Sequence, residues 1–509
     1  MTATRSSTVD DVLRRSARRV GDRSALVFED RSWTYRELDD AVTRAAAVLL
    51  GLGLGRGARV AAYGRNSDAY LIAFLACARA GLVHVPVNYA LTGGELAYLL
   101  EQSGSTVVLT DPSLADRVAG CGASVTRTVP LRDAPDSLLA RARTGDVPSL
   151  AVEVTDTDLV QLLYTSGTTS RPKGAMMTHR ALVHEYLSSV VALGLAADDA
   201  PLHSMPLYHS AQLHVFLLPY LAVGATNHLL ETPDIPEILR RVEADRIGAL
   251  FLAPTVWVPL SQHPDFATRD LGSLTKAFYG ASIMPQPVLQ RLQAALPELG
   301  FHNCFGQSEI GPLATVLGPA EHAERPESCG RAVLFVELRV VSPEDGTDVP
   351  AGELGEVVYR SPQLCEGYWD KPDETAAAFR DGWFRSGDLV RADDEGYITV
   401  VDRIKDVINT GGVLVASREV EDAIYTHPAV AEVAVIGTPD ERWIEAVTAF
   451  VVVKDEVTPE EIVTHARESL AGFKVPKHVH LVAELPRNAS GKLLKRVLRD
   501  SLPTAEGVG

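Results

Sequence analysis

The order of apolar and polar positions along the chain predicts a mixed α/β protein. Up to about residue 320, short apolar runs such as Ala249–Leu252 alternate with amphipathic helical patterns, as in proteins that pack helices on largely parallel strands. One helix is expected after Thr178, because threonine suits the N-cap position and the apolar residues that follow lie at helical spacing. The apolar face expected for this helix consists of Leu182, Val183, Tyr186, Leu187, Val190 and Val191.

The pattern changes after residue 335. Phe335–Val341 and Glu356–Tyr359 read as two strands on either side of a turn-rich segment, which predicts a β-rich subdomain. From about residue 400 onward the chain has the pattern of a separate small α+β unit, in which Thr458 and Glu461 form a capping box. The helix that follows this box is expected to present Ile462, Val463, Ala466 and Leu470 on one face.

Composition and charge narrow the class of protein. A chain of 509 residues is too long for one core and predicts at least two domains. Its five cysteines are scattered without paired spacing, which favours a reducing compartment over disulfides or a zinc site. No apolar signal region follows the first arginines, and the longest apolar run, Val215–Ala225, is too short to cross a membrane. We therefore expect a cytoplasmic protein without a transmembrane segment. The net charge of −18 argues against a nucleic-acid partner.

Lysine usage draws attention to one loop. The first of the nine lysines is Lys173, inside the stretch YTSGTTSRPKGAMMTHR, and six of the nine follow residue 402. A strand-like run, Leu159–Tyr164, leads into Thr165–Ser170, whose small and hydroxylated residues suit a cradle for an anion. The spacing is not that of a Walker A loop. A flexible surface loop is the alternative on local grounds.

The segment SGTTSRPKG at 166–174 resembles the phosphate loop of the adenylate-forming superfamily, which includes acyl-CoA synthetases, stand-alone adenylation domains and beetle luciferases. Further motifs similar to that family follow in the family's order over essentially the whole chain. They are Pro206–Ser210 (PLYHS), Asn303–Glu309 (NCFGQSE), Trp383–Asp388 (WFRSGD), Asp402–Asp406 (DRIKD) and Pro486–Lys492 (PRNASGK). The motif order is most similar to that of fatty-acid–CoA ligases. The resemblance implies a large N-terminal domain over 1–402 and a small mobile α+β domain over 403–509 that turns about Lys405.

The resemblance also implies the chemistry: a carboxylic acid and ATP form acyl-AMP and pyrophosphate, and the acyl group then passes to coenzyme A. Lys173 would act as a compact charge on the leaving pyrophosphate, Glu309 and the Thr165 hydroxyl would bind Mg²⁺, and Lys492 would bridge the carboxylate and the adenylate. Asp388 would accept both ribose hydroxyls, with Arg403 as a second contact. The nucleotide-binding residues implied in this way are Thr165, Ser166, Gly167, Thr168, Thr169, Lys173, Gly280, Ala281, Ser282, Asn303, Phe305, Gly306, Ser308, Asp388, Arg403 and Lys492.

On the thiol side, the resemblance implies that five residues face CoA, namely Gly411, Gly412, Trp443, Phe473 and Lys474. The sequence departs from the family there: Val413–Ser417 lacks the usual polar residue, Asn and Pro, and Ile444 stands where Gly is frequent. A carrier-protein thiol therefore remains an alternative acceptor to CoA.

The expected wall of the acid site is apolar. Its implied members are Tyr208, His209, Gln212, Tyr279, Gln307 and Ile310. The segments Tyr208–Val215, Tyr279–Ile283 and Ile310–Val316 contain no Lys, Arg, Asp or Glu. A dicarboxylate or an amino acid would leave a buried charge unpaired there. The prediction is therefore an apolar monocarboxylic acid, a medium- or long-chain fatty acid first and an aryl or cinnamic acid second. Besides a CoA ligase and a carrier-protein ligase, a third functional hypothesis is a catalytically inactive nucleotide-binding sensor. A homodimer is compatible with the sequence.

Overall fold

A computed structural model of the chain describes residues 7–165, 171–282, 284–411, 413–440, 442–487 and 493–502. The candidate residues Ser166, Gly167, Thr168, Thr169, Gly412 and Lys492 lie outside the described residues. The described residues form two compact units. The large unit holds residues 7–165, Pro172–Leu338 and Tyr359–Phe384, and the small unit holds Arg339–Val358 and the residues described from Arg385 onward. The expected domain boundary at 402/403 stays a prediction.

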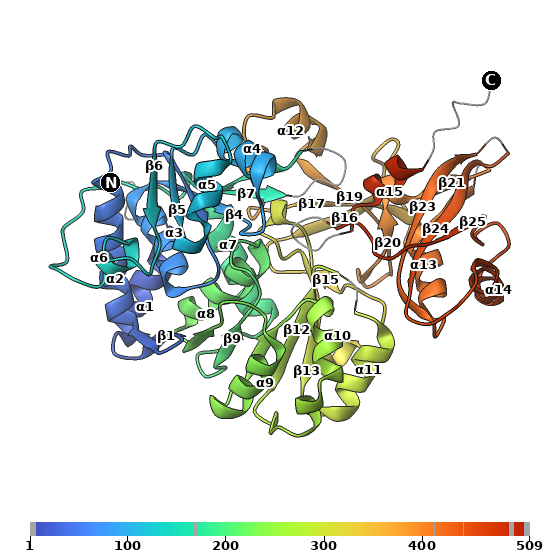
Figure 1. The fold of residues 1–509 in the computed structure, drawn as a ribbon, viewed down its shortest axis with the longest axis horizontal. Helices are drawn as coiled ribbons and strands as arrows, with labels where there is room; N and C mark the ends of the chain where they lie inside the picture. Colours follow the sequence, from blue (N-terminus) through green and yellow to red (C-terminus); the bar gives the residue numbers. More distant parts are fainter. Residues whose placement is uncertain are drawn as a thin grey trace. The chain divides into compact units, whose positions relative to one another are not determined.

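Within its described residues, the large unit contains two sheets (Figure 1). The order in the nine-stranded sheet is β15 (Arg331–Ala332), β14 (Thr315–Leu317), β13 (Gly300–Phe305), β12 (Lys276–Gly280), β11 (Ala249–Phe251), β9 (Pro201–His203), β10 (Asn227–Leu229), β1 (Ser24–Phe28) and β2 (Arg31–Thr34). The order in the six-stranded sheet is β6 (Arg127–Pro130), β5 (Val107–Thr110), β3 (Arg59–Tyr63), β4 (Val83–Val87), β7 (Leu159–Thr165) and β8 (Lys173–Thr178). Strands β9 to β13 pair in parallel, and so do β3 to β7, which confirms the expected largely parallel layers.

Helices pack on these sheets because this contact buries the apolar faces of both helices and sheets. In Figure 1, α9, α10 and α11 lie beside β12 and β13, and together they enclose an apolar core that includes the fully buried Trp257. The described helices of the large unit are α1 (Asp10–Val20), α2 (Tyr35–Leu50), α3 (Asp68–Ala80), α4 (Gly93–Ser103), α5 (Ala115–Gly120), α6 (Leu138–Ala142), α7 (His179–Ala192), α8 (Leu218–Val223), α9 (Ile235–Ala244), α10 (Pro254–Gln262), α11 (Gln286–Ala295) and α12 (Pro372–Ala378).

Helix α7 begins where the sequence predicts, but its buried face differs from the expected one. Thr178 is its N-cap, and the threonine side chain accepts a hydrogen bond from the backbone N–H of Ala181 at 3.2 Å. The prediction was wrong for Leu187 and Val191, which are 49% and 63% exposed. The polar side chains buried in their place are Glu185, Ser188 and Ser189. These groups have hydrogen-bond partners in the tertiary structure, so their burial could not be inferred from periodicity alone.

The small unit holds most of two further sheets. The first has the order β16 (Glu337–Val341), β17 (Leu354–Arg360), β19 (Trp383–Ala392) and β18 (Phe379–Arg380), with β20 (Ile398–Arg403) paired to β19. The second has the order β22 (Val413–Val415), β21 (Ile408–Thr410), β24 (Ile444–Val453) and β23 (Val430–Asp440), with β25 (His478–Leu481) paired to β24. The helices of this unit are α13 (Ser417–Tyr425), α14 (Pro459–Ser469) and α15 (Lys495–Ser501).

The expected capping box opens α14: the Thr458 side chain accepts from the N–H of Glu461, and the Glu461 carboxylate accepts from the N–H of Thr458. Ile462 and Ala466 are fully buried in the small unit's core. The fold class, a large α/β domain followed by a smaller α+β domain, is confirmed. None of the helices in the described ranges combines the length and apolarity that crossing a bilayer requires.

Candidate active site

The predicted phosphate loop connects two antiparallel strands at one edge of the six-stranded sheet. Thr165 ends β7, Lys173 begins β8, and the two residues face each other in register. The Lys173 ammonium lies 5.0 Å from the centre of the Tyr368 ring, a geometry in which the ring face attracts the cation. Tyr368 is held there because its neighbours run along β8: the N–H of Met176 donates to Gly367 O at 2.9 Å, and the N–H of Trp369 donates to Gly174 O at 2.8 Å.

Tyr368 also contacts the predicted metal ligand. Its hydroxyl donates to Glu309 Oε1 at 2.9 Å, and the N–H of Cys365 donates to Glu309 O at 2.8 Å. Glu309 lies in a short 3-10 helix, Ser308–Ile310, and is only 8% exposed. One tyrosine therefore touches both Lys173 and Glu309. Tyr368 is a candidate that the sequence did not indicate, because no local pattern marks it and only the fold brings it alongside β8.

The oxygen donors here fit Mg²⁺ rather than a transition metal. Mg²⁺ is usually held by one or two carboxylates together with substrate phosphates, and Glu309 and Thr165 are donors of that kind. In the described part of the chain, no group of three or more His, Cys, Asp or Glu side chains is arranged to hold a metal ion.

The carboxyl ends of β12 and β13 supply the residues expected at the adenine. Gly280 pairs with Cys304, and a Cβ on Gly280 would lie 2.1 Å from the Cys304 carbonyl oxygen, so only glycine fits. Gly306 has φ 157°, and a Cβ there would lie 2.0 Å from Pro312 O. The Asn303 side-chain NH₂ donates to Ser328 O at 3.1 Å. This bond leaves its Oδ1 as the atom that would accept from the adenine amino group.

The remaining adenine-side candidates line the same edge. Phe305 ends β13, and Ala281 and Ser282, which follow β12, are exposed, with Ala281 at φ 64°. The Ser308 hydroxyl lies 3.1 Å from that of Ser210. That contact brings the PLYHS and NCFGQSE motifs together, although almost a hundred residues separate them.

The acid-site candidates differ in exposure: one is exposed, two are partly buried and three are buried. Tyr208 packs against His209, with ring centres 4.7 Å apart, and against Tyr89 at 5.6 Å. His209 is solvent-exposed, and Gln307 is partly buried. Tyr279 is 3% exposed and its hydroxyl lies 3.0 Å from His322 Nε2.

Ile310 and Gln212 are fully buried. Gln212 belongs to a seven-residue π-helix, Ala211–Leu217, of the kind often found at functional sites. Its side-chain oxygen accepts from Met205 N at 3.1 Å, and its Nε2 lies 2.8 Å from His203 Nδ1. The Gln212 amide is therefore engaged within the fold, and its contact with an acid stays a prediction.

In the small unit, the two predicted ribose residues lie opposite each other. Asp388 on β19 pairs in register with Arg403 on β20, and the guanidinium forms an ion pair with the carboxylate. Asp388 is 2% exposed, inside a strand rather than at a turn or a helix N-cap, and its N–H donates to Ser386 Oγ at 3.0 Å. An ionised carboxylate held by an arginine accepts hydrogen bonds and does not donate them, as two ribose hydroxyls require.

The described thiol-side candidates are Gly411, directly after β21, Trp443, directly before β24, and Phe473 and Lys474, which follow α14. Gly411 has φ 63° and donates its N–H to Trp443 O at 2.5 Å. Arg442 and Lys477 place their charges 4.8 and 5.5 Å from the Trp443 ring centre. Lys474 lies 5.8 Å from the Phe473 ring centre, and its ammonium also bonds both oxygens of Glu419. The expected hinge residue, Lys405, lies in the 3-10 helix Ile404–Asp406 and is exposed.

The departure at Ile444 has a backbone consequence. Ile444 has φ 66° and is 60% exposed. A β-branched residue in this left-handed region is strained, whereas glycine adopts the conformation freely. The position therefore suits the glycine that the family often has there.

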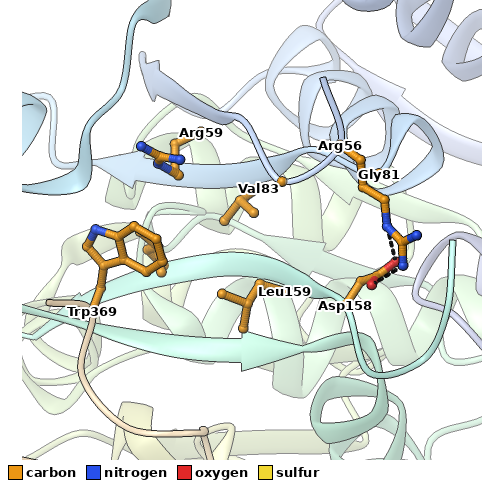
Figure 2. Close-up of a pocket in the computed structure, with 9 residues that line it drawn as sticks. Arg56, Arg59, Gly81, Val83, Asp158, Leu159 and Trp369 are labelled. Atoms are coloured by element: carbon orange, nitrogen blue, oxygen red, sulfur yellow. Dashed lines mark hydrogen bonds and ion pairs between the residues drawn. The ribbon is translucent and has the colours of Figure 1, made fainter. Parts of the chain in front are cut away.

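A cavity of about 280 Å³ lies beside β3, β4 and β7 (Figure 2). Val83 and Leu159 form its apolar part, with Trp369 at one side. At the opposite end the Arg56 guanidinium pairs with Asp158 at 2.5 Å. Arg59 donates to the carbonyl of Ser103 at 2.9 Å. The charged groups that line the cavity therefore have partners within the fold. None of the predicted site residues lines this cavity.

The chain is similar to known proteins over most of its length. Residues 13–369 match the AMP-binding enzyme family, and residues 419–492 match the AMP-binding enzyme C-terminal domain. A feruloyl-CoA synthase of Amycolatopsis sp is 39% identical over 92% of this chain and 93% of its own length. The medium/long-chain-fatty-acid–CoA ligase FadD8 of Mycobacterium tuberculosis is 33% identical over 94% of this chain and 87% of its own. The crystal structure of ATP-bound MatB from Rhodopseudomonas palustris superposes with a TM-score of 0.89 at 31% identity, covering 97% of this chain and 99% of that one. The chain belongs to the adenylate-forming superfamily of AMP-binding enzymes.

Proposed function

We propose that this protein is an ATP-dependent acid–CoA ligase. In the first half-reaction an oxygen of the acid attacks the α-phosphorus of ATP, the bond to pyrophosphate breaks, and acyl-AMP forms. In the second, the thiol of CoA attacks the acyl carbon and AMP leaves. Support comes from family membership and from two relatives that are themselves named for thioester formation with CoA.

The observation that carries this proposal is the contact of Tyr368 with both Lys173 and Glu309. Phosphoryl and adenylyl transfer depend on positioning and charge neutralisation rather than on covalent catalysis. The Tyr368 ring positions the Lys173 ammonium, and the Tyr368 hydroxyl positions the Glu309 carboxylate, as such a reaction requires. Bound Mg²⁺ would supply charge neutralisation at the phosphates, with Glu309 and Thr165 as its protein ligands. Lys173 would then stabilise the leaving pyrophosphate.

Asp388 and Arg403 complete the nucleotide contacts in this proposal. Asp388 accepts the ribose hydroxyls, and Arg403 orients its carboxylate through their ion pair. Lys492 bridges the acid and the adenylate in the first half-reaction. The small domain then rotates about Lys405. This rotation removes Lys492 from the active site and brings in the face that bears Gly411 and Gly412.

The acid is proposed to be an aryl acid of the hydroxycinnamate type. The sequence alone favours a fatty acid, but the relative at 39% identity is named a feruloyl-CoA synthase, whereas FadD8, named a medium/long-chain-fatty-acid–CoA ligase, is 33% identical. The rings of Tyr208, His209 and Tyr279 are also suited to packing against an aromatic acid. A medium- or long-chain fatty acid is the second candidate. Cytoplasmic location, a homodimer and delivery to a carrier protein stay predictions.

A panel of acids tests the proposal. The enzyme is incubated with Mg²⁺, ATP and CoA and with ferulate, cinnamate, octanoate, palmitate or succinate, and AMP and thioester are quantified by liquid chromatography with mass spectrometry. We expect AMP in step with thioester, fastest with ferulate and absent with succinate. Formation of ADP, or no AMP with any acid, would contradict the ligase assignment. A faster reaction with octanoate or palmitate would replace the aryl acid by the fatty acid. Replacing CoA with a pantetheinylated carrier protein decides the acceptor.

A further inference from the structure

Helix α7 buries a carboxylate behind the loop that carries Glu309. Glu185 is fully buried. The groups that bond its two oxygens are neutral donors, namely the Leu313 N–H, the Ser189 hydroxyl and the Gln363 amide. A buried carboxylate held only by neutral donors is costly for the fold, so its position needs a reason.

The contacts of Glu185 point to the loop formed by residues 309–313. Its Oε1 accepts from the N–H of Leu313 at 3.2 Å and from Ser189 Oγ at 3.3 Å. Its Oε2 accepts from Gln363 Nε2 at 2.6 Å. Gly311 has φ 104°, and a Cβ there would approach Glu185 Oε2 to 3.0 Å, so the loop packs directly on the carboxylate.

Gln363 holds the same loop from the other side. It is fully buried, and the Nε2 that bonds Glu185 also donates to the carbonyls of Ile310 at 3.2 Å and Leu313 at 3.1 Å. Its Oε1 accepts from Ser188 Oγ at 2.5 Å. The amide therefore joins α7 to both ends of the segment 310–313.

The chain just beyond Gln363 fixes Glu309 itself. The N–H of Cys365 bonds the Glu309 carbonyl, and the Tyr368 hydroxyl bonds its carboxylate. Residues 361–368 thus hold Glu309 by its backbone and side chain, and Gln363 ties this segment to Glu185. A helical pattern alone would place the polar face of α7 in solvent. In the structure, Glu185 and Ser188 on this face bond the segments that hold Glu309.

We propose that Glu185 and Gln363 are a positioning pair for Glu309, setting the affinity of the enzyme for Mg²⁺-bound ATP without touching the nucleotide. The proposal rests on the role proposed above for Glu309. Glutamine at 185 is close in size, but it can direct its oxygen toward only one set of donors. The NH₂ of the introduced glutamine must then face either Gln363 Nε2 or the Leu313 N–H. Both are donors themselves, so one of the two hydrogen bonds that connect residue 185 to this loop and to Gln363 is lost.

The test is a double-mutant cycle of Glu185→Gln and Glu309→Gln, read by calorimetric binding of ATP with Mg²⁺ and of AMP without Mg²⁺. We expect Glu185→Gln to weaken Mg²⁺·ATP about tenfold and AMP by less than twofold. In the Glu309→Gln background it should cost less than a further twofold, because residues that act through one another are not additive. Ser188→Ala, which removes only the hydroxyl on Gln363, should weaken Mg²⁺·ATP about threefold and guards against failure of the first variant to fold.

The matched control is Tyr186→Phe, on the same helix. It removes a buried bond of similar length, from the Tyr186 hydroxyl to His214 Nδ1 at 2.9 Å, which leads away from the loop. It should lower the melting temperature and leave both affinities within twofold of wild type. Equal losses for Mg²⁺·ATP and AMP, full additivity with Glu309→Gln, or no loss would each overturn the positioning role. A wild-type enzyme that binds Mg²⁺·ATP but forms no AMP with any acid would overturn the proposed function, while the cycle would still report on positioning.

Discussion

Replacing Asp388 by asparagine should weaken nucleotide binding far more than it weakens the fold. In the proposed complex Asp388 accepts two ribose hydroxyls. Asparagine keeps one acceptor oxygen and turns the other position into a donor, so one hydrogen bond to a charged acceptor is lost. Such a bond is worth about 1.5–3 kcal/mol, which corresponds to a roughly 10- to 150-fold weaker Kd at 1.4 kcal/mol for each factor of ten. The acid should bind as before.

The effect on stability should be smaller, for a reason visible in the structure. Arg403, the partner of Asp388, has a side chain that is 39% exposed, so water can solvate the guanidinium once the charge opposite is removed. We expect a loss on the order of 1 kcal/mol. Asp199→Asn is the matched control. The Asp199 side chain is 9% exposed and pairs at 2.8 Å with Lys276, which is 23% exposed, at the opposite end of β12 from Gly280.

The assay is isothermal titration with ATP and Mg²⁺, together with urea unfolding of both variants. The reasoning predicts a large affinity loss for Asp388→Asn and none for Asp199→Asn at similar stability losses. If the two variants bind ATP equally well, Asp388 is a structural partner of Arg403 and not a ribose ligand. If both lose affinity in proportion to stability, the loss reflects unfolding.

Three further outcomes are expected. Lys492→Ala should slow acyl-AMP formation by a factor equivalent to about 2.7–4 kcal/mol if its contact resembles an oxyanion donor, while ATP binding is kept; normal pyrophosphate exchange would refute that role. Lys405→Pro fixes φ at one value and should slow thioester formation more than adenylation in single-turnover measurements on a folded variant; an equal loss in both steps would exclude this hinge. Ile444→Gly relieves about 1–2 kcal/mol of left-handed strain and loses about 0.5–1 kcal/mol to backbone entropy. The small unit should therefore gain up to about 1.5 kcal/mol of stability in urea unfolding; a loss of stability would show that Ile444 is not strained.

Local signals in the sequence were sufficient for several elements. The threonine at 178 and the Thr458–Glu461 box cap helices where expected, because a cap depends on residues within one turn. The strand before the phosphate loop also lies where its apolar run predicts, with β7 ending at Thr165. The order of six motifs along the chain is sufficient to predict the superfamily.

Features set by long-range contacts could not be predicted in the same way. Tyr368 joins Lys173 to Glu309 only because residues 366–369 run along β8. Glu185 is buried because Gln363, far away in the chain, satisfies it. The departure at Ile444 was visible in the sequence, but its meaning required a backbone angle.

The central claim, adenylation followed by thioester formation, is tested most directly by the fate of the acid's own oxygen. Ferulate labelled with ¹⁸O at both carboxylate oxygens is incubated with the enzyme, Mg²⁺, ATP and CoA, and the products are analysed by mass spectrometry. Attack of the carboxylate on the α-phosphorus predicts one ¹⁸O in AMP and one in the thioester. Unlabelled AMP, or label in inorganic phosphate formed together with ADP, would contradict it.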